Sequence, residues 1–248
     1  MFRKVKALVL RETKYKEADK ILTVLTEKGG KISLSARGVM RQNSKLSAAC
    51  QLFAFSEMTL YENRGKWYVK EAQIIEQFLG LRSELGNFAL AAYFVELLEA
   101  VSDSDMPDGR LLSLGLNSLF ALSNKLYEPE HIKAVFELRL MCISGYEPSI
   151  FHCPVCGSEN IEKPVFSTVG GTILCSGCTG EYSGRFLLSP SSVEAMKYII
   201  TADNKRVFSF NMDETAKKKL FDVCEGYVSA QLERNFYSLT YWQKLKNI

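Results

Sequence analysis

The sequence contains no long run of apolar residues. Its mean hydropathy is −0.04 over 248 residues, and no apolar stretch approaches the roughly 18–20 residues that cross a bilayer as a helix. The N-terminal segment MFRKVKALVLRETKYKEADK has neither a sustained apolar core nor a small-residue cleavage site, so it does not resemble a signal peptide. Hydrophobic residues still make up 47% of the chain, which suffices for a packed core. We expect a soluble, cytoplasmic protein.

Signatures of the common enzyme classes are also absent. The sequence has no G-x-x-x-x-G-K-[ST] loop, no H-E-x-x-H helix and no G-x-S-x-G turn. It has two histidines, of which we expect His131 on a helix surface and His152 as a redundant neighbour of a cysteine motif. Val169-Gly170-Gly171-Thr172 fits a turn better than a phosphate-binding loop. The sequence therefore gives no motif of a common enzyme class.

The cysteines do not form the even set that is typical of a secreted disulfide framework. Four of the seven form two C-x-x-C pairs that are separated by 18 residues, namely Cys153, Cys156, Cys175 and Cys178. Four thiolates at this spacing predict one tetrahedral, structural Zn²⁺ ion per chain, because all four coordination positions are filled by protein. A redox C-x-x-C motif or a chance spacing is the alternative. The other three cysteines lie in apolar segments and fit core thiols.

Basic residues concentrate in the N-terminal third. Residues 1–80 contain 15 Lys and Arg and 8 Asp and Glu, a net charge of +7, whereas residues 81–248 carry −4. Such asymmetry favours a polyanion partner for one part of the chain, although a solvated, lysine-rich surface would look the same.

The basic third reads as five short strands rich in β-branched residues, at 5–10, 21–26, 31–37, 51–61 and 66–75. Gly29-Gly30 suits a hairpin between the second and third strands. In the third, Ile32, Leu34 and Ala36 alternate with polar residues. Five strands in under 80 residues predict a small barrel, most commonly an OB-fold.

The rest of the chain reads as helical. We predict an α+β multidomain protein in which an OB-fold at 1–80 is followed by a helical domain at 81–148 and 187–248, with the cysteine module inserted at 149–186. Ser189 and Pro190 have the pattern of an N-cap followed by a first-turn proline, and Asp213 is placed to cap a long helix through Leu232.

A cationic loop follows the third strand. Residues 36–45, ARGVMRQNSK, combine three cations with glycine and small polar side chains, so they can lie along a phosphate backbone. Trp67 is placed to stack on a base, although the barrel core is the commoner position for an aromatic strand residue. Together with neighbouring lysines, the candidate nucleic-acid contacts are Arg37, Arg41, Lys45, Lys31, Lys14, Lys16 and Trp67.

The segment VKALVLRETKYKEADKILTVLTEKGGKISLSARGVMR follows an order of strand, acidic-centred turn, strand, glycine hairpin and A-R-G turn. In this pattern, and over essentially its whole length, the chain resembles the bacterial DNA repair protein RecO family. The resemblance implies an N-terminal OB domain, a helical domain and a zinc module, although some members lack the cysteines. It also implies DNA contacts at Arg37 and Arg41, and less specifically at Lys45.

The same resemblance implies a recombination mediator of the RecFOR pathway, located in the cytoplasm at the nucleoid. Such a protein binds single- and double-stranded DNA and anneals complementary strands without ATP. Because annealing makes and breaks no covalent bond, the resemblance implies a protein that is not an enzyme and has no catalytic residue. The implied partners are RecR, the acidic C-terminal tail of single-strand-binding protein, and indirectly RecA, whose loading is assisted. Cations on the helices would surround the tail, either Lys133 and Arg139 or Lys217, Lys218 and Lys219.

Two other functional classes remain open from the residues alone. An RNA-binding or transcription-associated protein can also combine an OB barrel with a zinc ribbon. A nuclease would need clustered carboxylates that hold Mg²⁺, and the basic third has no such cluster.

Overall fold

The computed structural model describes residues 2–104 and 107–246. The chain divides into two compact units, one made of residues 1–124 and 237–248 and the other of residues 125–236. The N-terminal barrel, the helices and the cysteine cluster confirm the predicted fold class. The domain boundaries given above, at 1–80, 81–148, 149–186 and 187–248, stay a prediction.

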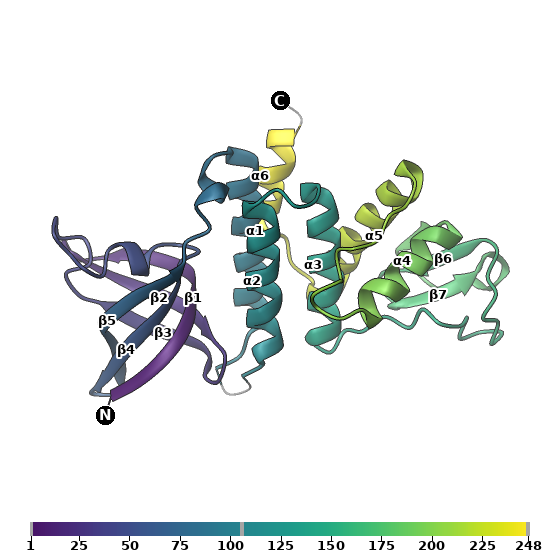
Figure 1. The fold of residues 1–248 in the computed structure, drawn as a ribbon. Coiled ribbons are helices and arrows are strands. Elements are labelled where there is room, and N and C mark those ends of the chain that lie inside the picture. Colours follow the sequence, from purple (N-terminus) through teal and green to yellow (C-terminus); the bar gives the residue numbers. More distant parts are fainter. Residues whose placement is uncertain (1, 105–106, 247–248) are drawn as a thin grey trace. The chain divides into compact units, whose positions relative to one another are not determined.

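The first unit begins with a closed barrel in the strand order β1-β2-β3-β5-β4 (Figure 1). Its strands are β1 (Phe2–Tyr15), β2 (Asp19–Thr26), β3 (Gly30–Ala36), β4 (Phe55–Asn63) and β5 (Lys66–Glu76). Strand β1 is longer than predicted because a bulge between Val9 and Arg11 lets it bend and pair with β4 at one end and β2 at the other. Strand β4 starts later than predicted, after a turn of 3₁₀ helix, η1 (Ala48–Cys50).

Alternation of side chains along the strands places one face inside the barrel. Leu34 and Ala36 are buried as predicted, and Ile32 packs partly buried against the same core. Polar neighbours on β3 point outwards, so the strand presents Ser33 and Ser35, and Arg37 is exposed directly after the strand ends.

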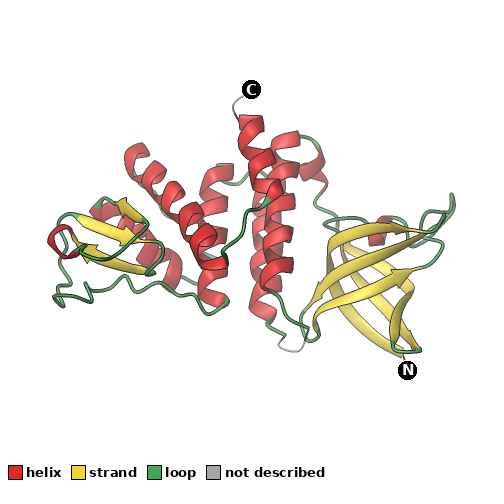
Figure 2. Ribbon diagram, turned by 180° about the vertical axis from the view of Figure 1, so that it is seen from behind, coloured by secondary structure: helices red, strands yellow, loops and turns green. Residues whose placement is uncertain are grey.

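Three helices complete the first unit: α1 (Leu85–Val101), α2 (Gly109–Ser123) and α6 (Tyr237–Lys246), with a short 3₁₀ segment, η2 (Leu79–Arg82). Helix α1 packs against β1, α2 and α6 (Figure 2) and is apolar around most of its circumference, as expected for a helix with neighbours on several sides. The hydroxyl of Ser238 donates to the Glu96 carboxylate and so joins α6 to α1.

The second unit holds α3 (Pro129–Ile143), α4 (Pro190–Thr201) and α5 (Glu214–Leu232). A small antiparallel sheet in the order β7-β6-β8 is formed by β6 (Pro164–Ser167), β7 (Thr172–Cys175) and β8 (Arg185–Leu187), with η3 (Ser176–Cys178) after β7. Ser189 and Asp213 cap α4 and α5 as predicted. Among the described helices, none is long and apolar enough to cross a membrane.

Helix α3 is more deeply enclosed than its sequence suggests, so two expectations about it are wrong. His131 is buried rather than on the surface, and its ring nitrogen lies 3.0 Å from the Phe208 carbonyl oxygen. The Lys133 ammonium is also buried, and it pairs with Glu137 at 2.8 Å and with Glu225 at 2.7 Å. Arg139 donates to the Ile200 carbonyl at the end of α4. Lys133 is therefore too buried to surround a ligand. Both terminal nitrogens of the partly buried Arg139 donate inside the unit, to the Ile200 carbonyl and to Asn204, and its contact with the tail stays a prediction.

Close docking of the β2–β3 hairpin generates a stability prediction. A Cβ atom on Gly30 would lie 2.2 Å from the Asp103 carbonyl oxygen, whereas a Cβ on Gly65, in another turn, would meet nothing within 4 Å. Both glycines have positive φ. We expect Gly65→Ala to lower the free energy of unfolding by about 1 kcal/mol, and Gly30→Ala by about 3 kcal/mol because the hairpin must also move. Chemical denaturation measures both, and equal losses would contradict the docking.

Candidate nucleic-acid interface and metal site

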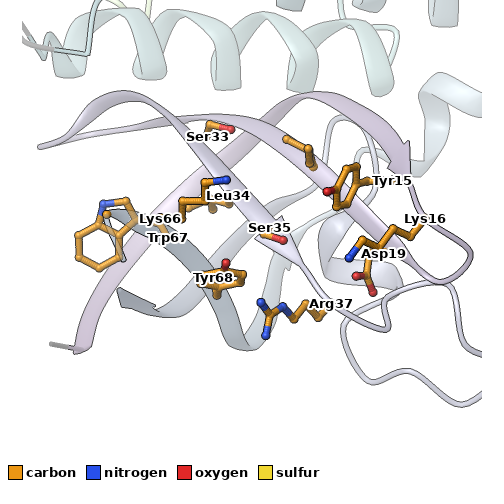
Figure 3. Close-up of a pocket in the computed structure, with 12 residues that line it drawn as sticks. Tyr15, Lys16, Asp19, Ser33, Leu34, Ser35, Arg37, Lys66, Trp67 and Tyr68 are labelled. Atoms are coloured by element: carbon orange, nitrogen blue, oxygen red, sulfur yellow. The ribbon is translucent and has the colours of Figure 1, made fainter. Parts of the chain in front are cut away.

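A hollow of about 550 Å³ opens on the outer surface of the barrel (Figure 3). We call it the barrel hollow. Strands β1, β2, β3 and β5 and the turns at their ends supply its lining, which includes Tyr15, Lys16, Ser35, Arg37, Trp67 and Tyr68. Cations, hydroxyls and aromatic rings thus surround one cavity, a combination that suits the phosphates and the bases of a nucleic acid.

Closure of the barrel brings the cationic loop to an aromatic strand. Strands β3 and β5 pair in parallel, with Ser35 opposite Tyr68. The Arg37 guanidinium, just after β3, lies 4.3 Å from the centre of the Tyr68 ring, within the range of a cation–π contact. Arg37 makes no ion pair in the described part of the chain, so its N–H groups stay available to an anion.

The turn that carries Lys16 is joined to the loop that carries Arg37. The Asp19 carboxylate accepts a hydrogen bond of 2.7 Å from the Gly38 N–H, and the Met40 N–H donates to the Ala18 carbonyl at 3.0 Å. Two separate segments are therefore held at the same end of the hollow. The sequence showed the cations of both segments but gave no signal for Asp19 as the residue that joins them.

The predicted contacts do not all meet in the barrel hollow. Lys16, Arg37 and Trp67 line it. Arg41 and Lys45 are exposed on the loop that follows Arg37, and Lys14 is exposed next to Tyr15. These three exposed cations lie outside the cavity, and we call them the basic margin.

Trp67 lies between the barrel core and the hollow. Its ring is half-buried and packs against the barrel core, and another part of it lines the hollow. In Figure 3 Trp67 and Tyr15 lie at opposite ends of the cavity. A stacking role for Trp67 stays a prediction.

Lys31 has a partner inside the first unit. Its ammonium is half-buried and donates a hydrogen bond of 2.7 Å to the Glu99 carbonyl in the last turn of α1. A cation at this position satisfies a helix carbonyl and interacts favourably with the helix dipole. The structure thus gives Lys31 a stabilising contact, and its contact with DNA stays a prediction.

The four predicted cysteine ligands converge in the second unit. The sulfur atoms of Cys153, Cys156, Cys175 and Cys178 all lie within 4.8 Å of one another, and none forms a disulfide. Metal–sulfur bonds of about 2.3 Å in a tetrahedron place sulfur atoms about 3.8 Å apart. The Cys156 and Cys175 sulfurs are 3.6 Å apart. The cluster therefore has the dimensions of a four-coordinate metal site.

Ionisation differs across this cluster. Burial raises the pKa of Cys153, but hydrogen bonds from the backbone of Cys175, Cys156 and Val155 outweigh it and lower the pKa to about 6. A hydrogen bond with Cys156, together with burial, raises the pKa of Cys175 to about 12. The Cys153 thiolate forms readily, whereas burial and neighbouring negative charge raise the pKa of Cys175 and Cys178 and oppose their ionisation. A bound cation would remove that repulsion.

Comparison with known proteins gives matches along nearly the whole chain. The family model "Recombination protein O N terminal" matches residues 1–78, and "Recombination protein O C terminal" matches residues 82–240. A DNA repair protein RecO from Acetivibrio thermocellus is 33% identical over 245 residues, covering 99% of this chain and 98% of the relative. The RecO protein of Alkaliphilus metalliredigens is 31% identical over 246 residues, covering 99% and 100%.

The contact of Lys31 generates a second prediction. We expect Lys31→Met to lower the free energy of unfolding by about 1–2 kcal/mol, because it removes a charged donor from the end of α1. Lys28→Met is the matched control, since Lys28 is exposed on the same hairpin, and it should change stability by less than about 0.5 kcal/mol. Denaturation midpoints test the pair. If Lys31→Met weakened DNA binding without lowering the free energy of unfolding, the contact of Lys31 with α1 would not contribute to stability.

Proposed function

The chain belongs to the RecO family of DNA repair and recombination proteins, and from this premise we propose that it binds single- and double-stranded DNA and anneals complementary strands without ATP. The main support for the proposal is the composition of the barrel hollow. The Arg37 guanidinium lies over the Tyr68 ring, and Lys16 lines the same cavity. Cations attract phosphates, and aromatic faces stack on bases of any sequence.

Annealing requires two polyanions to approach each other. A surface with a net charge of +7 over residues 1–80 lowers the electrostatic repulsion between the strands. No covalent bond forms or breaks in this process, so the proposal includes no catalytic residue. The basic margin of Arg41, Lys45 and Lys14 would contribute further phosphate contacts outside the hollow.

Charge reversal at the hollow tests this proposal. If about five phosphates are neutralised, the logarithm of the binding constant for single strands should fall with the logarithm of salt concentration with a slope near −3.5. The double variant Arg37→Glu with Arg41→Glu should make this slope less negative by about 1.4, because each lost phosphate contact accounts for about 0.7. Affinity should fall by similar factors for all sequences, and annealing should slow.

The control for this double variant is Lys205→Glu with Lys218→Glu, two exposed lysines of the second unit. It makes the same change in net charge and should leave DNA affinity nearly unchanged. Binding by fluorescence anisotropy, together with thermal melting, separates the two effects. If the Arg37 and Arg41 variant binds like the wild type, the loop is a solvated turn and the assignment fails.

For the cysteine cluster we propose one structural Zn²⁺ ion per chain, held by Cys153, Cys156, Cys175 and Cys178. The distances between the sulfur atoms and the all-thiolate donor set suit zinc in a closed site. Zinc would supply folding energy to the small sheet around it, because structural sites of this kind contribute on the order of 10–16 kcal/mol.

Removal of one ligand tests the zinc proposal. Cys156 is exposed, so Cys156→Ser removes a ligand but little packing. We expect zinc content to fall from about one ion per chain to well below that value, and limited proteolysis to cut within residues 149–186. Cys142→Ser, outside the cluster, should keep the metal. A wild-type protein that contains no metal, and whose protease resistance does not change with a chelator, would refute the site.

The proposed partners follow from family membership. They are RecR, the C-terminal tail of single-strand-binding protein and, indirectly, RecA, in the cytoplasm at the nucleoid. An RNA-binding protein of similar architecture would prefer RNA and would not anneal DNA. Annealing of complementary oligonucleotides coated with single-strand-binding protein, without ATP and with RNA as a competitor, distinguishes these functions.

A further inference from the structure

Aromatic rings continue across the barrel beyond the hollow. Tyr68 stacks on Tyr61 of the neighbouring strand β4, with ring centres 5.1 Å apart and planes 19° apart. Tyr61 in turn lies 6.5 Å from Phe2 at the start of β1. We call these three residues the aromatic stripe. Its members come from β5, β4 and β1, which are neighbouring strands in the barrel. The stripe therefore crosses the sheet rather than following one strand.

The stripe belongs to the outer face of the barrel. Tyr61 is directly opposite Tyr68, and Phe2 is directly opposite Tyr61. Their chain neighbours Leu60 and Val69 point into the core, and side chains alternate along a strand. Exposure increases along the stripe: Tyr68 is nearly buried, Tyr61 is half-buried and Phe2 is 65% exposed. The ring most accessible to a ligand is therefore the one farthest from the hollow.

A cation lies over each end of the stripe. Arg37 covers Tyr68 at 4.3 Å, and the Lys70 ammonium lies 4.8 Å from the centre of the Phe2 ring. Lys70 pairs with the exposed Glu71 carboxylate at 4.0 Å. An exposed pair at this distance is weak, so the ammonium stays accessible. The aromatic rings can stack on the bases of a single strand, and the cation at each end of the stripe can contact a phosphate of the same strand.

We propose that single-stranded DNA runs from the barrel hollow along the aromatic stripe and ends at Phe2 and Lys70, where Phe2 stacks on a base and Lys70 contacts a phosphate. This inference rests on the proposed function and adds a second contact region to it. It assigns roles to two residues at the start of β1 and on β5. The path crosses β5, β4 and β1 and is independent of the basic margin.

A protein partner is the competing occupant of this surface. Protein interfaces favour a continuous apolar core with few charged residues at its centre. The stripe instead has an exposed ring at one end and a cation over each end, which suits a strand of alternating bases and phosphates. Base stacking also depends little on sequence, as annealing of arbitrary complements requires.

The length of the oligonucleotide separates the two contact regions. One barrel of this type covers about 4–16 nucleotides, so thymidine oligomers of about 4 and about 16 nucleotides bracket the range. The short oligomer fits the hollow, whereas the long one also reaches the stripe. Binding is measured by fluorescence anisotropy at low salt on the full chain, and thermal melting verifies folding.

We expect Phe2→Ala to weaken binding of the long oligomer by about 5- to 100-fold and to leave the short one unchanged. Phe2→Trp should keep the affinity for the long oligomer, because the larger ring still stacks. Tyr237→Ala, which removes an aromatic ring that is 90% exposed on α6, should affect neither. Lys70→Gln should make the salt dependence less steep by about 0.7 for the long oligomer alone, and Lys28→Gln is its charge-matched control.

The outcomes distinguish two failures. If wild-type protein binds neither oligomer, the proposed function itself is wrong. If it binds both and Phe2→Ala matches the wild type at both lengths, the hollow binds DNA but the path along the stripe is refuted. Equal losses at both lengths would also refute the path, because Phe2 would then act through the barrel as a whole. A stripe that binds a protein partner would give the second result.

Discussion

The parallel pairing of β3 with β5 is the contact on which the candidate interface depends. Every other neighbouring pair in the barrel is antiparallel, and this pair joins strands that are not consecutive in the chain. Its register places Leu34 beside Trp67 and Ser35 beside Tyr68. Because the loop with Arg37 begins at the end of β3, the same pairing that closes the barrel also places a guanidinium over an aromatic ring. One strand pairing therefore both closes the barrel and assembles the candidate interface.

Closure also explains why the cations at this site remain available. Strand side chains alternate, so the apolar residues of β3 fill the barrel while Arg37 projects outwards. The carboxylate in the hollow, Asp19, accepts a backbone N–H from Gly38 and is thus occupied in holding two turns together. Neutralisation of Arg37 by that carboxylate would weaken anion binding. Because Asp19 instead accepts a hydrogen bond from the Gly38 backbone, it stabilises the two turns and does not pair with Arg37.

Local patterns in the sequence predicted the elements, and long-range contacts determined what the sequence did not show. Alternation identified the strands, cysteine spacing identified the four-cysteine cluster, and Ser189 and Asp213 marked two helix starts. These signals involve residues close in sequence or a strict spacing. The burial of Lys133 was not predictable, because it depends on Glu225 in α5, a helix far away in the sequence. Likewise, Lys31 reads as a surface cation until α1 is placed against the hairpin.

The last helix of the chain returns to the first unit. Residues 125–236 form the second unit, and α6 then packs against α1. The second unit is therefore an insertion between α2 and α6, with both of its ends attached to the first unit. An insertion of this kind is tolerated when its ends lie near each other at the surface of the host. It needs a core of its own, and the buried Lys133–Glu137 pair and the cysteine cluster lie entirely within it. The excess of positive charge belongs to the barrel of the first unit, where residues 1–80 have a net charge of +7, whereas the cysteine cluster belongs to the second unit.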